Sequence, residues 1–163
     1  MNHLFTPWRM TYLTTNNKPK TGCVFCHALA EPDSAENLIL FRGERAFVIL
    51  NRFPYTSGHL MVLPYDHQPS LEALDAPTRA EMMELTTRGT AVLTAIYHPQ
   101  GFNVGINLGE AAGAGVAAHL HIHLVPRWVG DVNFMTAVGE TRVLPETLEV
   151  TWQKVKEAWV QET

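Results

Sequence analysis

The sequence predicts an α+β fold with a mostly antiparallel sheet of about five strands, one long helix and a C-terminal helix. Three short apolar segments come first, a long amphipathic segment follows, and two further strand-like segments come after it. The turns between the first strands are too short for the crossover connections of a wholly parallel sheet. The order of the segments predicts the α+β class, and the short turns favour antiparallel pairing.

The first two strands are expected at residues 38–41 and 46–50, which are apolar, rich in β-formers and joined by a turn containing Gly43. Residues 59–63 form a third such segment, which Pro64 ends because proline cannot continue a strand ladder.

The long helix is expected to begin at Asp75 and Pro77, a typical N-cap and first-turn pair, and to end before Pro99. One apolar stripe at three- and four-residue steps contains Met82, Leu85, Gly89, Val92 and Ile96. Gly89 in this stripe predicts a close approach to the sheet.

A fourth strand is expected at residues 102–108, with Val104, Ile106 and Leu108 on one face and Asn103, Gly105 and Asn107 on the other. The Gly- and Ala-rich stretch 109–118 then leads into the last strand, 119–124, and residues 145–160 are expected to be helical.

At 163 residues and 18.2 kDa, the chain has the size of one domain with a full core. A net charge of -4 without a basic run argues against a nucleic-acid polymer as partner. No apolar run approaches the ~20 residues of a membrane helix, and the N-terminus does not resemble a secretory signal. We therefore expect a cytoplasmic protein with no membrane partner.

The last strand carries three histidines in strict alternation, His119, His121 and His123, with aliphatic residues between them. In a strand, this spacing places three imidazoles on one face and three aliphatic side chains in the core. Imidazole titrates near neutral pH, so the row offers a nucleophile, an acid or base, or metal ligands. The alternative is a core strand whose histidines are simply hydrogen-bonded.

Cys23 and Cys26 are the only cysteines, and their spacing is that of half a structural zinc site. A thioredoxin-like redox role is disfavoured because no βαβ pattern surrounds the pair. Two free thiols beneath the sheet remain an alternative.

Residues 119–125 resemble the signature of the histidine triad superfamily of nucleotide hydrolases and transferases. The resemblance covers about residues 23–134, and its other parts follow in order: Asn51, Gly58, His59, His67 and Asn107. The flanks 6–12 and 126–134 are similar to the branch that contains bacterial dinucleoside tetraphosphate phosphorylases. The family comparison implies an N-terminal arm (1–22), a histidine triad domain (23–134) and a C-terminal extension (135–163) packed on that domain.

The resemblance implies that His121 attacks the α-phosphorus of a nucleotide and forms a covalent nucleotidyl-histidine. A main-chain carbonyl of the same strand could fix its tautomer. His123 would donate to the phosphate oxygens, and His59 would steady that end of the triad. His119 is the fourth histidine of the catalytic set that the resemblance implies.

For the nucleotide, the resemblance implies that Asn51 contacts the ribose hydroxyls and Asn107 a phosphate. Gly113 and Gly115 would let main-chain N–H groups approach the phosphates. Taken alone, an asparagine at a strand end is a turn former and a glycine-rich loop is a flexible connection.

The chain departs from many hydrolases of the family, which carry a glutamine shortly before the triad. Ala114, Gly115 and Val116 occupy that region here. The departure slightly favours inorganic phosphate over water as the acceptor of the nucleotide.

The resemblance also implies a structural zinc ion held by Cys23, Cys26, His67 and His119, in which case His119 is a ligand and not an acid. Trp8, Trp128 and Phe47 could flank a nucleobase, and Arg9 and Arg127 could meet distal phosphates, although such aromatic residues are more often core and such arginines surface charges.

The expected function is nucleotidyl transfer on dinucleoside polyphosphates, with phosphorolysis slightly favoured over hydrolysis. Two alternatives stay open: a hydrolase of nucleoside phosphoramidates, and a non-enzymatic module that binds nucleotide or zinc. A homodimer formed by extending the sheet is also implied by the resemblance.

Overall fold

The computed structural model describes residues 22–131 and 145–161, and it confirms the predicted α+β architecture. One five-stranded sheet has the order β1-β2-β3-β5-β4, and each neighbouring pair is antiparallel. Its strands are β1 (Ile39–Arg42), β2 (Ala46–Leu50), β3 (Leu60–Pro64), β4 (Gly101–Ile106) and β5 (Ile122–Arg127). Within the described residues, no helix is both long and apolar enough to cross a membrane.

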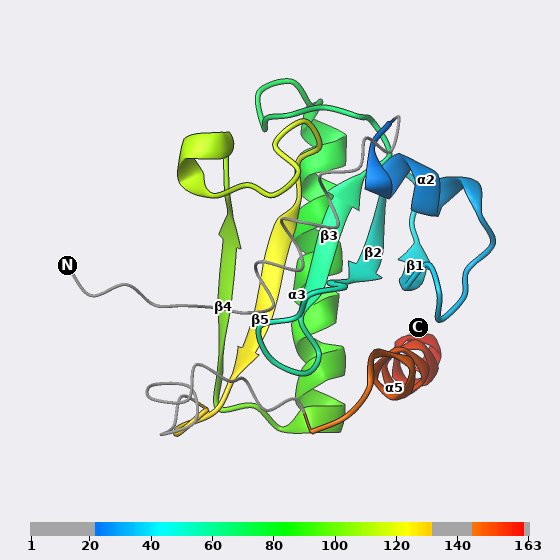
Figure 1. Ribbon diagram of the computed structural model, residues 1–163, viewed down its shortest axis with the longest axis vertical. Helices are drawn as coiled ribbons and strands as arrows, with labels where there is room; N and C mark the ends of the chain where they lie inside the picture. Colours follow the sequence, from blue (N-terminus) through cyan, green and yellow to red (C-terminus); the bar gives the residue numbers. More distant parts are fainter. Residues whose placement is uncertain (1–21, 132–144, 162–163) are drawn as a thin grey trace.

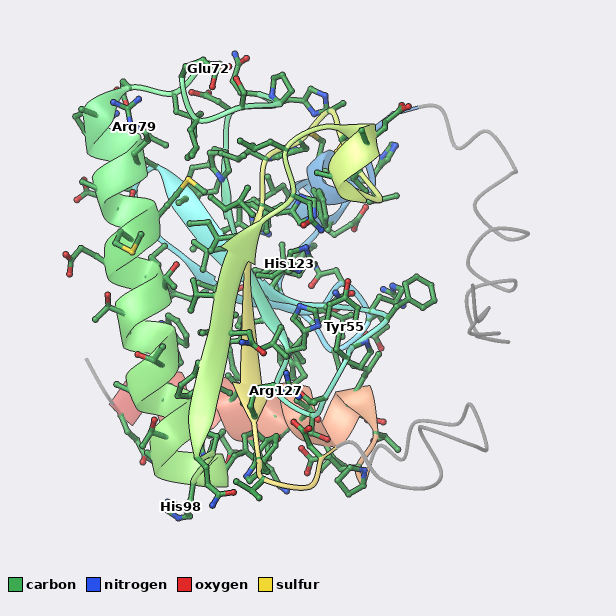
Figure 2. The ribbon with its side chains drawn as sticks, turned by 90° about the vertical axis from the view of Figure 1, so that its left-hand side faces the viewer. Tyr55, Glu72, Arg79, His98, His123 and Arg127 are labelled. Carbon is green, nitrogen blue, oxygen red and sulfur yellow. The ribbon has the colours of Figure 1, made fainter. Side chains whose placement is uncertain are left out.

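Two helices, α3 (Ala76–Tyr97) and α5 (Leu148–Gln161), cover the same face of the sheet (Figure 1). The short helix α2 (Val24–Ala30) lies near the edge that contains β1, and a single 3-10 turn occupies Glu110–Ala112. Viewed from the side, the labelled His123 and Tyr55 lie across the sheet from α3 (Figure 2). The sheet therefore has one face packed on helices and one face that carries histidines.

Helix α3 begins and ends as the sequence predicts. The Asp75 carboxylate accepts the Thr78 N–H at 2.8 Å, which satisfies one free donor of the first turn. His98 ends the helix in the left-handed conformation. A Cβ on Gly89 would lie 2.9 Å from Leu124 Cδ2, so the predicted close approach of helix and sheet is confirmed.

Several boundaries differ from prediction. The first hairpin is confirmed, whereas β3 is shifted by one residue and β4 ends at Ile106 rather than at residue 108. The prediction of a strand from residue 119 is wrong for its first three residues, because β5 begins at Ile122. The Leu120 N–H donates to Gln68 O at 2.7 Å, so this main chain is engaged outside the sheet ladder.

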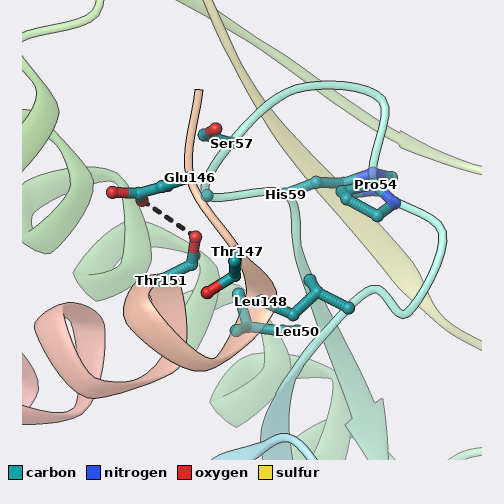
Figure 3. A pocket seen from close by; sticks show the side chains of 9 residues that line it. Leu50, Pro54, Ser57, His59, Glu146, Thr147, Leu148 and Thr151 are labelled. Atoms are coloured by element: carbon teal, nitrogen blue, oxygen red, sulfur yellow. Dashed lines mark hydrogen bonds between the residues drawn. The ribbon is translucent and has the colours of Figure 1, made fainter. Parts of the chain in front are cut away.

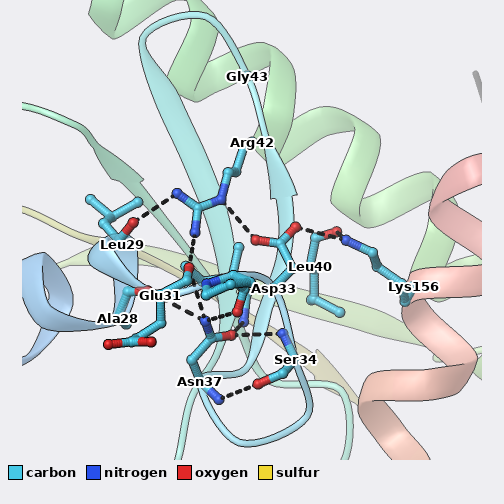
Figure 4. Close-up of polar contacts among 12 residues, drawn as sticks. Ala28, Leu29, Glu31, Asp33, Ser34, Asn37, Leu40, Arg42, Gly43 and Lys156 are labelled. Atoms are coloured by element: carbon cyan, nitrogen blue, oxygen red, sulfur yellow. Dashed lines mark hydrogen bonds and ion pairs between the residues drawn. The ribbon is translucent and has the colours of Figure 1, made fainter.

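Helix α2 was not predicted, and a polar network holds its C-terminal end against β1 (Figure 4). The Arg42 guanidinium donates to Leu29 O at 3.0 Å and Glu31 O at 2.8 Å, and it pairs with Asp33 at 2.7 Å. Lys156 of α5 also contacts Asp33, at 3.0 Å. The segment that contains both cysteines is therefore tied to the sheet.

The C-terminal helix is confirmed, and it packs through Thr151, Val155 and Trp159, which are buried. Some predictions fall outside the described residues: the arm 1–21 with Trp8 and Arg9, and the segment 132–144.

Candidate active site and metal cluster

His121 and His123 lie side by side on the histidine face, with ring centroids 4.8 Å apart. Nδ1 of His121 lies 2.8 Å from the main-chain oxygen of His119. Because a carbonyl oxygen can only accept, Nδ1 carries the proton and Nε2 of the neutral ring has a free lone pair. His121 is thus held in the tautomer that a nucleophile at Nε2 requires.

A second hydrogen-bond chain fixes His123. The Tyr55 N–H donates to Nδ1 of His59 at 3.2 Å, so a neutral His59 carries its proton on Nε2. That nitrogen lies 3.0 Å from Nδ1 of His123, which must then be the acceptor. Nε2 of His123 consequently bears a proton and can donate to an anion.

Burial favours the neutral form of the His121 and His123 rings. His59 is fully buried and His121 is 5% exposed. Burial lowers the pKa of His121, although its bond to the His119 carbonyl acts in the opposite direction. For His123, burial and then the nearby His121 lower the pKa to about 4.

Asn51 follows β2 and stands beside His59. Its Nδ2 lies 3.4 Å from His59 Nδ1, and its main-chain N–H donates to His59 O at 2.9 Å. Its Oδ1 accepts the Phe53 N–H at 2.9 Å, so the residue also shapes the turn. The structure therefore brings Asn51 to the histidine row and confirms a turn-forming contact.

The other histidine of the row turns away from this pair. His119 donates from Nε2 to Pro64 O at 3.0 Å, which leaves Nδ1 facing two thiols: Cys23 Sγ at 3.4 Å and Cys26 Sγ at 3.7 Å. His67 Nδ1 lies 3.4 Å from Cys26 Sγ. The three imidazoles of the row do not share one role, because His119 belongs to a separate cluster.

That cluster fits a tetrahedral zinc ion. The ligand atoms of Cys23, Cys26, His67 and His119 all lie within 4.8 Å of one another. Around zinc, with bonds of ~2.3 Å to sulfur and ~2.0 Å to nitrogen, neighbouring sulfur and nitrogen ligands are separated by roughly 3.5 Å. Three of the sulfur–nitrogen distances, 3.4, 3.4 and 3.7 Å, are close to this value. The side chain of His119 already presents an unprotonated nitrogen. Two thiols and two imidazoles are a ligand set that zinc prefers.

The residues predicted to contact phosphate follow β4, whose last residue, Ile106, pairs with Ile122 between His121 and His123. Asn107 directly follows β4 and is half-buried, whereas Gly113 and Gly115 are exposed in the loop before His119. Gly113 has a φ of +87°, a conformation that glycine adopts without strain, as the C-cap of the 3-10 turn.

Three side chains that could have contacted the nucleobase or the distal phosphates have partners within the protein: Phe47, Trp128 and Arg127. Phe47 is fully buried and stacks on Tyr65, so it is a core residue. Trp128 donates from Nε1 to Tyr97 O at 3.3 Å. The Arg127 guanidinium pairs with Asp131 at 2.6 Å and donates to Asn103 at 2.6 Å, so its charge is already neutralised.

Two aromatic residues beside the histidines were missed by the sequence analysis. Tyr55 is 41% exposed, and its ring lies 4.6 Å from that of His59 and 6.2 Å from that of His123. Phe25 contacts the rings of both His119 and His121. Only the position of Phe25 between the cysteines gave a signal that could have revealed it.

A cavity of about 150 Å³ lies behind His59, between the loop before β3 and the start of α5 (Figure 3). Its walls include Leu50, Pro54, Ser57, Glu146, Leu148 and Thr151. Neither His121 nor His123 lines it. His59, which contacts His123, also lines the cavity, so the cavity adjoins the histidine site without including His121.

Comparisons with known proteins agree with this geometry. The sequence model of the HIT domain family matches residues 33–129, which is more than half of the chain. The AP-4-A phosphorylase of Mycobacterium tuberculosis strain H37Rv is 38% identical over 168 residues, which cover 99% of this chain and 86% of the relative.

Two solved structures are similar as well. A Zn-bound histidine triad family protein from Mycobacterium smegmatis has a TM-score of 0.69 and 29% identity, covering 86% of this chain and 94% of that one. A HIT family protein from Bacillus anthracis has a TM-score of 0.59 and 28% identity, covering 66% and 74%. With the family model matching across the sheet and the histidine row, the chain belongs to the HIT domain, or histidine triad, family.

Proposed function

We propose that the protein is a nucleotidyl-transferring enzyme that cleaves dinucleoside polyphosphates through a covalent intermediate on His121. The observation that carries the proposal is the hydrogen bond from His121 Nδ1 to the His119 carbonyl, which directs the lone pair of the ring to Nε2. The similarity to an AP-4-A phosphorylase over almost the whole chain supports the substrate class.

In the first step, Nε2 of His121 attacks the α-phosphorus, a P–N bond forms, and the P–O bond to the departing nucleotide breaks. His123 donates from Nε2 to a phosphate oxygen, where charge develops. Such a positioned donor is worth about 3 kcal/mol in a transition state. In the second step an acceptor oxygen attacks the same phosphorus, and the P–N bond breaks to regenerate His121.

We propose inorganic phosphate as the preferred acceptor. The loop before His119 contains Ala114, Gly115 and Val116 and no glutamine that could orient a water molecule. Asn51 is proposed to contact the ribose hydroxyls, and Asn107, Gly113 and Gly115 are proposed to contact phosphate.

We further propose that Cys23, Cys26, His67 and His119 bind one zinc ion with a structural role. Four protein ligands fill a tetrahedral shell and leave no position for substrate. When bound, the ion supplies a cross-link between the segment at Cys23–Cys26, the loop after β3 and the start of the histidine row.

Among the strands that the structure describes, β4 has a neighbour on one side only, and this edge supports the proposal of a homodimer. Strand β4 is at the edge, and Val104 on it is 50% exposed. An unpaired edge strand offers a row of main-chain donors and acceptors for a second copy. We propose that two β4 strands pair and extend the sheet.

With a diadenosine tetraphosphate substrate and inorganic phosphate, we expect ATP and ADP as the products, with AMP as a minor product. The His121→Asn variant keeps a side-chain donor but lacks Nε2, so we expect kcat to fall by at least about 10⁴-fold. His98→Asn is the matched control, because His98 is exposed and lies in a left-handed conformation that Asn tolerates.

Separation of the products by anion-exchange chromatography identifies the nucleotides formed and measures kcat for each variant. AMP as the main product in the presence of phosphate would contradict phosphorolysis. Turnover of a nucleoside phosphoramidate at a much higher kcat/KM than the tetraphosphate would instead support the phosphoramidate hydrolase, and no turnover of either would support a binding module.

We expect about one zinc ion per chain by elemental analysis of protein purified from zinc-containing medium. Cys26→Ser should lose the metal and lower Tm, because a structural ion contributes to folding stability. His27→Ala, which changes the neighbouring residue, should retain it. Fewer than about 0.1 ions per chain in the wild type would argue against the site.

In sedimentation analysis at micromolar concentration, we expect the wild type to have twice the 18.2 kDa chain mass. Val104→Lys should shift the equilibrium to monomer because it places like charges opposite one another at the proposed junction. Val160→Lys alters a residue of α5 that is 68% exposed and should remain dimeric. A monomeric wild type would be incompatible with the proposed pairing.

A further inference from the structure

We propose that Phe25 is a positioning residue for His121, and that the Cys23–Cys26 segment thereby holds the nucleophile in its productive orientation. The inference rests on the proposed role of His121. It assigns to the metal-cluster segment a second task, which is to restrain the ring that attacks phosphorus.

The contacts of Phe25 place it between the two functional clusters. Its ring centroid lies 5.5 Å from that of His119, at an interplanar angle of 82°, and 5.4 Å from that of His121, at 53°. Phe25 is only 7% exposed and belongs to the apolar core. Its contacts with the rings of both histidines are direct.

His121 needs such a contact because one hydrogen bond does not fix a ring. The bond from Nδ1 to the His119 carbonyl selects the tautomer and limits rotation about the Cβ–Cγ bond, but small coupled rotations about Cα–Cβ and Cβ–Cγ can still tilt the ring. On another side the ring meets His123 nearly at a right angle, with an interplanar angle of 76°. Contact with Phe25 restricts the remaining rotation, so that Nε2 keeps one direction.

Phe25 is itself held at both ends of α2. Cys23 and Cys26 flank it in sequence, and their thiols face the His119 ring at 3.4 and 3.7 Å. At the other end, Arg42 binds the carbonyl oxygens of Leu29 and Glu31. The main-chain carbonyl of His119 therefore contacts the His121 ring directly, and the Cys23–Cys26 segment contacts the same ring through Phe25. A metal ion on the cluster would couple these two restraints.

The test compares Phe25→Leu and Phe25→Met, which remove the ring but keep apolar volume, with Phe41→Leu as control. Phe41 packs on Trp159 and Arg88. Replacing Phe41 therefore perturbs core packing without removing a contact to His121. For both Phe25 variants we expect kcat to fall by about 10- to 100-fold, because a displaced nucleophile loses its attack geometry. KM should change by less than about threefold, since substrate contacts remain.

A second readout does not require turnover. In ¹⁵N-histidine NMR spectra at fixed pH, wild-type His121 should show one tautomer protonated at Nδ1, with the resonance assigned by its loss in His121→Asn. The Phe25 variants should show a broadened or mixed His121 signal at unchanged zinc content, whereas Phe41→Leu should keep the wild-type signal.

A wild-type His121 signal together with a kcat equal to that of Phe41→Leu, in either folded Phe25 variant, would overturn the positioning role. Absence of turnover in the wild type, with the expected NMR change in the variants, would instead count against the proposed function and leave the restraint supported.

Discussion

The hydrogen bond between Nδ1 of His121 and the carbonyl oxygen of His119 is the interaction on which the site depends. It selects the tautomer of His121, and its acceptor, the His119 carbonyl, lies just before β5 begins at Ile122. The side chain of that same residue is fixed by Pro64 O and faces the cysteine pair. One residue therefore contributes its ring to the cysteine–histidine cluster and its carbonyl to the proposed nucleophile.

The rest of the fold holds this arrangement in place. Strand β5 pairs with β3 on one side and β4 on the other, and this pairing sets His123 beside His59. On the opposite face, Leu124 packs so closely on α3 that a side chain at Gly89 would collide with it. Register across the sheet thus fixes both the histidine row and the helix that supports it.

The sequence was sufficient for the fold class, the long helix and the grouping of the histidines, because these follow from hydrophobic period, capping residues and motif order. It was insufficient at residues 119–121, where alternation predicted a strand. There the Leu120 N–H donates to Gln68 O and the His119 carbonyl accepts from the His121 ring, and the alternation of residue types reveals neither bond. Phe25 and Tyr55 were missed for a related reason: an aromatic residue is as common in a core as beside a site.

The proposed mechanism requires a transient P–N bond at His121. The most direct measurement is rapid acid-free quenching of a reaction on radiolabelled diadenosine tetraphosphate, followed by digestion and mass spectrometry under alkaline conditions. The account predicts an acid-labile adenylyl group on the peptide that contains His121, and its absence in His121→Asn. Rapid consumption of substrate by the wild type with no such adduct at any quench time would contradict it.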